Sequence, residues 1–168
     1  MHIWTIEKWF RHLNYDQSNY RTGLRLRFDQ KVHPEIKRAI KSFCKWIRSE
    51  YSFPVRVPIY VKTAKYIKAQ DGEMVSATFL GPIDKSQEPY IRIASGDVSE
   101  LLNTLDIYTS VPQRDNALAG ILGLIAHELT HYFQWINGIE LTEKGCERQA
   151  KAYVDYILDE YKETREHP

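Results

Sequence analysis

Residues 117–138 have the sequence ALAGILGLIAHELTHYFQWING, and they form most of the longest helix that the chain predicts. The segment is strongly apolar up to Ala126, which is typical of a helix buried in the middle of a domain. We expect the helix to cover about residues 114–137, after a loop that holds Pro112. It should end at Gly138, because glycine readily adopts the left-handed conformation that closes a helix.

Three polar residues interrupt the apolar run in the pattern His-Glu-x-x-His. His127 and His131 are four residues apart, so they project from one face of the helix and can share one metal ion. Neutral imidazole is a preferred ligand of Zn²⁺, and a site with three protein ligands keeps a fourth position for a water molecule. Glu128 is offset by about 100° of helix rotation, where it can act as a general base without coordinating the metal.

The alternative interpretation is a set of polar residues on a solvated stripe of the helix. With the six histidines of this composition, random placement gives about 0.02 copies of the motif per chain. An unpaired His-Glu-His cluster in an apolar helix would also be costly to bury, and a metal ion would offset that cost. The motif therefore predicts a zinc site.

A catalytic zinc site needs a third protein ligand. Gln134 and Asn137 stand where a metzincin has glycine and histidine, which excludes that class. His167, the only later histidine, lies at the end of the chain. The ligand should therefore be a carboxylate of the last helix, which we expect at residues 142–161, antiparallel to the first because the chain turns at Gly138.

Glu147 is the preferred third ligand because it belongs to the apolar stripe of that last helix, where a carboxylate needs a partner. Glu143, one turn earlier on the same face, is the reserve candidate, and Glu140 is too close to the turn. The alternative for Glu147 is a boundary carboxylate paired with Lys151 or Arg148.

Tyrosines and an apolar strand supply further candidates for the site. Tyr153 and Tyr156, on the ligand helix, are candidates for stabilising the transition state, although packing explains them equally well. Tyr132 adjoins the motif but should point away from it. The strand expected at residues 75–80 can hold an extended substrate through its main chain, with the candidate residues Ser76, Ala77 and Thr78, or it can be a covered edge.

The remaining periodicities predict an α+β domain. Helices are expected at residues 3–13, from His33-Pro34 onward, and at 97–105 with Asp97 as its cap; strands are expected at 24–28, 55–61, 75–80 and 90–94. The last two strands flank a polar loop, residues 81–87, which is suited to joining antiparallel neighbours. This order fits a single domain, residues 1–168, with a small, mostly antiparallel sheet packed on one side of the helices.

Length, charge and cysteine content limit the classes of protein that this chain can belong to. A chain of 168 residues and 19.8 kDa has room for one core. Its net charge of +1 says nothing about a nucleic-acid or membrane partner, and residues 117–126 are too short to cross a bilayer. Early charges argue against a signal peptide, and Cys44 and Cys146 fit free thiols in a reducing compartment, so we expect a cytoplasmic protein.

The run His127-Glu128-Leu129-Thr130-His131, followed by Glu147-Arg148-Gln149-Ala150, resembles the small gluzincin-type zinc metallopeptidases, including minimal single-domain and ImmA/IrrE-like proteins. The resemblance covers about half of the chain. It implies a zincin-like fold with an active-site helix and a ligand helix, zinc on His127, His131 and Glu147, Glu128 as general acid/base, and a peptide substrate along a sheet edge. Lys151 stands where larger gluzincins have an aspartate that orients a histidine ligand.

Two functions are compatible with these residues. The first is a zinc-dependent endopeptidase in which Glu128 moves protons between water and the leaving amine. The second is a non-catalytic, metal-containing regulatory or peptide-binding module. A purely structural zinc needs a fourth protein ligand and no base, whereas this sequence offers a base and no obvious fourth ligand, so the enzyme is favoured.

Overall fold

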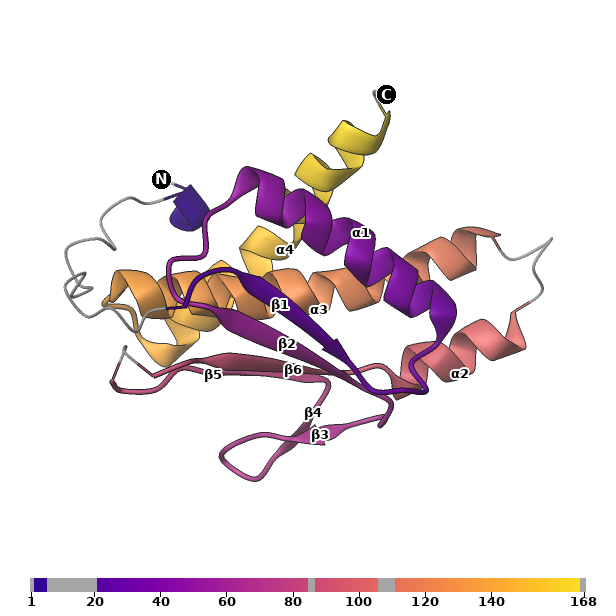
Figure 1. Ribbon diagram of the computed structural model, residues 1–168, viewed down its shortest axis with the longest axis horizontal. Coiled ribbons are helices and arrows are strands. Elements are labelled where there is room, and N and C mark those ends of the chain that lie inside the picture. Colours follow the sequence, from indigo (N-terminus) through magenta and orange to yellow (C-terminus); the bar gives the residue numbers. More distant parts are fainter. Residues whose placement is uncertain (1, 6–20, 85–86, 106–110, 167–168) are drawn as a thin grey trace.

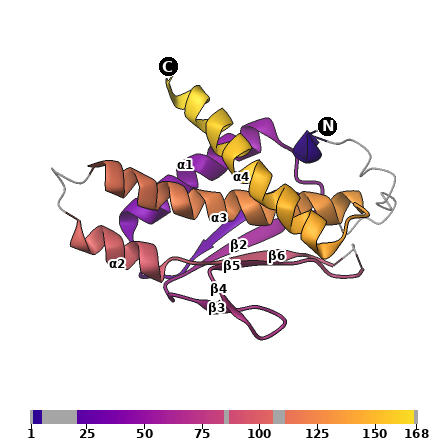
Figure 2. The same cartoon turned by 180° about the vertical axis from the view of Figure 1, so that it is seen from behind.

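The computed structural model describes residues 2–5, 21–84, 87–105 and 111–166 as a sheet covered by helices on one face (Figure 1). The helices are α1 (Pro34–Glu50), α2 (Gly96–Thr104), α3 (Val111–Asn137) and α4 (Glu143–Glu166), with a 3₁₀ turn, η1, at Ile3–Thr5. The strands are β1 (Leu24–Phe28), β2 (Val57–Lys62), β3 (Ile67–Lys68), β4 (Met74–Val75), β5 (Ala77–Leu80) and β6 (Tyr90–Ala94). Helices α1, α3 and α4 lie on one side of the sheet, and the β3–β4 hairpin lies on the other (Figures 1 and 2). The α+β class is confirmed.

The main sheet is mixed, so the prediction of a mostly antiparallel sheet was wrong. Its strand order is β1-β2-β6-β5, with β1 and β6 both parallel to β2 and only β5 antiparallel to its neighbour β6. Helix α1 connects β1 to β2 as a crossover, which returns the chain to the same end of the sheet. The β3–β4 hairpin and β5 connect β2 to β6, and they likewise bring the chain back so that β6 runs parallel to β2. Antiparallel pairing across the 81–87 loop is confirmed.

Several boundaries predicted for helices and strands differ from those in the structure. The strand expected at residues 75–80 is divided at Ser76 into β4 and β5, and β3 was not predicted. Pro112 lies inside the first turn of α3, which tolerates proline because its N–H groups have no helical partner. Asp97 lies in the first turn of α2 after Ser95, so it is not the cap. In the helix expected at 3–13, residues 3–5 form η1 and residues 6–13 lie outside the described residues.

A tight turn joins α3 to α4 and was predicted from Gly138. This glycine has a φ of 61°, its N–H donates to Trp135 O, and the N–H of Ile139 donates to Gln134 O. These two bonds form a Schellman motif, which satisfies the last carbonyls of α3. The side chain of Thr142 then accepts a hydrogen bond from the N–H of Gly145 at 3.0 Å and opens α4. As a result α4 runs back along α3.

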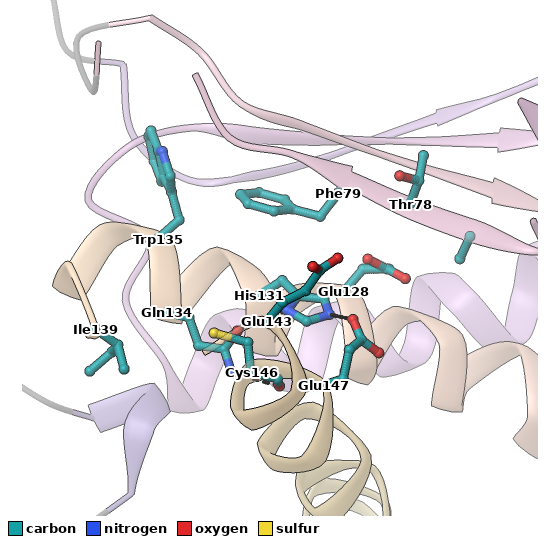
Figure 3. A pocket seen from close by; sticks show the side chains of 11 residues that line it. Thr78, Phe79, Glu128, His131, Gln134, Trp135, Ile139, Glu143, Cys146 and Glu147 are labelled. Atoms are coloured by element: carbon teal, nitrogen blue, oxygen red, sulfur yellow. Dashed lines mark hydrogen bonds and ion pairs between the residues drawn. The ribbon is translucent and has the colours of Figure 1, made fainter. Parts of the chain in front are cut away.

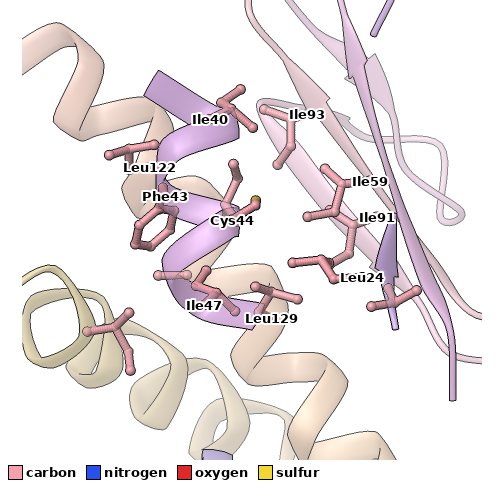
Figure 4. Packing of buried hydrophobic residues seen from close by; sticks show 14 of the residues in the cluster. Leu24, Ile40, Phe43, Cys44, Ile47, Ile59, Ile91, Ile93, Leu122 and Leu129 are labelled. Carbon is pink, nitrogen blue, oxygen red and sulfur yellow. The ribbon is translucent and has the colours of Figure 1, made fainter. Parts of the chain in front are cut away.

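The core lies between the sheet and the helices, and it packs against the buried side of α3 (Figure 4). Buried isoleucines of α1 meet those of β2 and β6, with Leu122 and Leu129 of α3 closing the cluster. From η1, the Trp4 ring stacks on Phe133, and its indole N–H donates to Thr130 Oγ1 at 3.0 Å. Because Thr130 lies inside the His-Glu-x-x-His segment, these contacts attach that segment to η1.

Tyr132, which helix rotation predicts to point away from His127, is buried and ties α3 to the segment that precedes β2. Its hydroxyl donates to Val55 O at 2.6 Å and accepts from Val55 N–H at 3.2 Å, in a buried environment. We predict that Tyr132→Phe lowers the free energy of unfolding by about 1–3 kcal/mol, because two buried backbone groups lose their partner. Urea unfolding measures this change.

The matched control is Tyr60→Phe, which removes a hydroxyl from an exposed ring on β2. It should change the free energy of unfolding by less than about 0.5 kcal/mol. Equal effects of the two substitutions would contradict the role given to Tyr132.

Candidate metal centre and active site

Three predicted ligands meet where α4 passes α3. The Nε2 atoms of His127 and His131 are 3.2 Å apart, and the Glu147 carboxylate lies 2.8 Å from His131 Nε2 and 3.3 Å from His127 Nε2. Two ligand nitrogens about 2.05 Å from a tetrahedral zinc ion would be about 3.3 Å apart, close to the separation observed. The three residues therefore form a cluster that fits a metal ion. Glu143 does not belong to this cluster, although it lies nearby.

Gln134 fixes the orientation of His131, and the sequence did not identify it as part of the site. Its amide nitrogen donates to Cys146 O at 3.0 Å and to Gln149 Oε1 at 2.9 Å, both on α4. Because the Cys146 carbonyl can only accept, the amide oxygen of Gln134 must face His131 Nδ1, 2.8 Å away. Nδ1 therefore donates to Gln134, which leaves Nε2 as the ring atom that faces the metal cluster. The sequence signal that could have identified Gln134 is its position three residues after His131, because this spacing places both side chains on one face of the helix.

The protonation of His127 also suits metal binding. Burial lowers the pKa of His127, and the neighbouring His131 lowers it further, whereas the Glu147 carboxylate acts in the opposite direction. The net shift is downward, so the neutral imidazole is favoured at neutral pH. Neutral imidazole is the form that coordinates metal ions.

Glu128 is a buried carboxyl beside the cluster (Figure 3). Burial, with a further contribution from the Glu147 carboxylate, raises the pKa of Glu128 from 4.5 to about 8. A carboxyl with a pKa near the working pH can both accept and return a proton. The raised pKa of Glu128 therefore lies in the range in which a carboxyl can exchange protons near neutral pH.

A cleft passes over the cluster between α3, α4 and β5. One pocket, of about 460 Å³, contains His131, Glu147 and Glu128 and extends toward the end of α3 (Figure 3). A second pocket, of about 580 Å³, contains His127 and extends the other way over Gly120 and Gly123. Ala77 and Glu128 line both pockets, so the two form one cleft with the cluster at its middle.

Strand β5 forms the wall of this cleft and is the last strand of the sheet. Ser76 lines one pocket, Thr78 the other, and Ala77 both, so all three predicted residues lie along the cleft. Ser76 O accepts a hydrogen bond from Ala94 N–H in the direction of β6. Because hydrogen-bonded and non-hydrogen-bonded pairs alternate in an antiparallel ladder, Ala77 and Phe79 direct their N–H and C=O groups off the sheet edge.

The two tyrosines considered for transition-state stabilisation are not brought to the cluster. The Tyr153 hydroxyl accepts from Ile3 N–H at 2.9 Å, and the Tyr156 ring packs against His2. Both rings therefore face the N-terminal turn, and neither lines the two pockets of the cleft. The helix rotation that places Glu147 toward α3 directs these side chains to another face of α4.

Comparison of the chain with family models, with curated proteins and with solved structures finds no match. In the described part of the chain, no helix combines the length and the apolar composition needed to span a membrane. Cys44 and Cys146 are both free thiols, as the sequence indicated.

We predict that Gln134→Leu weakens zinc binding about 10- to 100-fold, because His131 loses the acceptor that holds its tautomer and ring orientation. Gln134→Glu should recover most of the affinity, since a carboxylate can accept the same N–H. Competition with a chromophoric zinc chelator measures both effects. Gln113→Leu makes the same change at an exposed position in the first turn of α3 and serves as the control. Wild-type affinity in the leucine variant would contradict the assignment.

A second prediction concerns the metal-free protein. The folded state raises the pKa of Glu128 to about 8, so it keeps a proton that the unfolded chain releases near pH 4.5. Raising the pH through this window therefore destabilises the folded state. Urea unfolding in EDTA should show Glu128→Gln gaining stability relative to the wild type as pH rises from 5 to 8. A difference that does not change with pH would contradict the burial of an ionisable Glu128.

Proposed function

We propose that the protein is a zinc-dependent peptidase that hydrolyses peptide bonds in the cleft between β5 and α4. The observation that carries the proposal is the convergence of His127, His131 and Glu147 on one point beside a buried carboxyl, Glu128. Two histidines and one carboxylate are the ligand set of one class of catalytic zinc sites. Structural zinc sites almost always have four protein ligands, and the described residues contribute only three here.

Zinc bound by these residues would polarise the scissile carbonyl and acidify a water molecule. Glu128 removes a proton from the attacking water and later delivers it to the leaving amine. A nearby cation favours the ionised carboxylate, so metal binding would lower the pKa of Glu128 and prepare it as a base. Gln134 keeps His131 in the tautomer that presents Nε2 to the metal.

The substrate is an extended peptide segment that pairs with the open edge of β5. The backbone groups of Ala77 and Phe79 are available for main-chain hydrogen bonds along this edge, which holds a peptide without regard to its sequence. In an extended chain successive side chains point to opposite sides. Side chains on one side of the peptide therefore enter the pockets on either side of the metal centre.

The test is the hydrolysis of unfolded casein by zinc-loaded wild type and Glu128→Gln. The substitution keeps the size of the side chain but removes the base, so turnover should fall about 100-fold or more while zinc stays bound. Glu140→Gln, an exposed position outside the cleft, is the matched control and should cleave like the wild type.

Equal cleavage by wild type and Glu128→Gln, with zinc retained in both, would rule out Glu128 as the base. A wild type that binds zinc and peptide but cleaves no substrate would favour the non-catalytic, peptide-binding alternative.

A further inference from the structure

The pocket toward the end of α3 has aromatic walls that are held in place. Phe79 and Trp135 both line it, with their ring centroids 6.2 Å apart. The Trp135 indole donates to Pro82 O at 2.8 Å, and Gly81 lies directly beneath the ring, where a Cβ atom would come within 2.5 Å of it. The loop after β5 therefore requires glycine at position 81 in order to seat this tryptophan. The result is a fixed aromatic surface beside the cleft.

Glu143 supplies a carboxylate on the opposite wall. Three glutamates line the pocket, but Glu128 and Glu147 belong to the metal centre and its base. The Glu143 carboxylate points across the pocket toward β5 and Phe79 (Figure 3). No described residue forms an ion pair with Glu143, and no lysine or arginine is among the described residues that line the pocket. A negative charge thus faces an aromatic wall with no cation of the described chain between them.

We propose that this pocket binds a lysine or arginine side chain of the substrate and that Glu143 determines this preference. The inference rests on the proposed peptidase function and specifies its substrate class. Aromatic faces attract a cation and cover the aliphatic part of a long basic side chain. A carboxylate then pairs with the charged end, most favourably with a guanidinium group. The pocket volume of about 460 Å³ accommodates such a side chain.

Glu143 also has a structural role that the experiment must separate from recognition. It lies in the first turn of α4, where an acidic residue interacts favourably with the helix dipole. Loss of that interaction would reduce stability without changing which peptide is preferred. A change of preference, rather than a loss of binding, is therefore the informative result.

The experiment measures peptide binding without requiring turnover. Zinc-loaded Glu128→Gln protein is titrated with fluorescein-labelled octapeptides of Ala, Gly and Ser that carry one central Arg, Lys, Leu, Phe or Glu. The Arg and Lys peptides should bind about tenfold more tightly than the others, and high salt should reduce the difference. Adding Glu143→Lys should reverse the preference toward the Glu peptide, and Glu143→Gln should abolish it. Glu140→Lys makes the same charge change outside the pocket and should leave the preference unchanged.

Preference for the Leu or Phe peptide, equal binding of all five peptides, or no binding would overturn the inference. So would a basic preference that survives Glu143→Lys. Failure of the proposed function has a different signature, since zinc-loaded wild type would then bind the Arg peptide in the same manner but leave it intact.

Discussion

The close antiparallel contact of α3 with α4 is the constraint on which the site depends. The Schellman turn at Gly138 starts the return of the chain, and Gly123 sets how near the helices come, because a Cβ there would lie 3.2 Å from Val154 Cγ1. That distance is shorter than most Cβ contacts in proteins, so Val154 would have to shift to admit a side chain at position 123. With the helices this close, Glu147 reaches both imidazoles from the next element of the chain.

The same contact aligns the ligands as well as bringing them together. Gln134 hydrogen-bonds across to Cys146 O and Gln149, and these bonds turn its amide oxygen toward His131 Nδ1. On its other side α3 is fixed by Trp4 on Thr130 and by Tyr132 on Val55. These two hydrogen bonds therefore hold α3 at Thr130 and Tyr132, on either side of His131 in the sequence.

The parts of this arrangement that depend on local spacing were predictable from sequence. His127 and His131 share a face because of the helical repeat, and Glu147 follows from a glycine turn and an apolar stripe. Strand pairing was not predictable in the same way, since the parallel order around β2 depends on where distant segments return. Gln134 was missed because its role depends on a backbone carbonyl twelve residues away. Tyr153 was a candidate for the site only because it lies on the same helix as Glu147. Its hydrogen-bond partner, Ile3, lies 150 residues earlier in the chain, so nothing in the sequence indicated the direction of its side chain.

If His127, His131 and Glu147 hold one zinc ion, the metal should be present in the purified protein. Element-resolved mass spectrometry of wild type and Glu147→Ala, both purified without chelator or added metal, measures this directly. We expect close to one zinc per chain in the wild type and a large loss in the variant, with the far-ultraviolet circular dichroism spectrum unchanged. Absence of zinc from the wild type, or full zinc occupancy in Glu147→Ala, would contradict this ligand assignment.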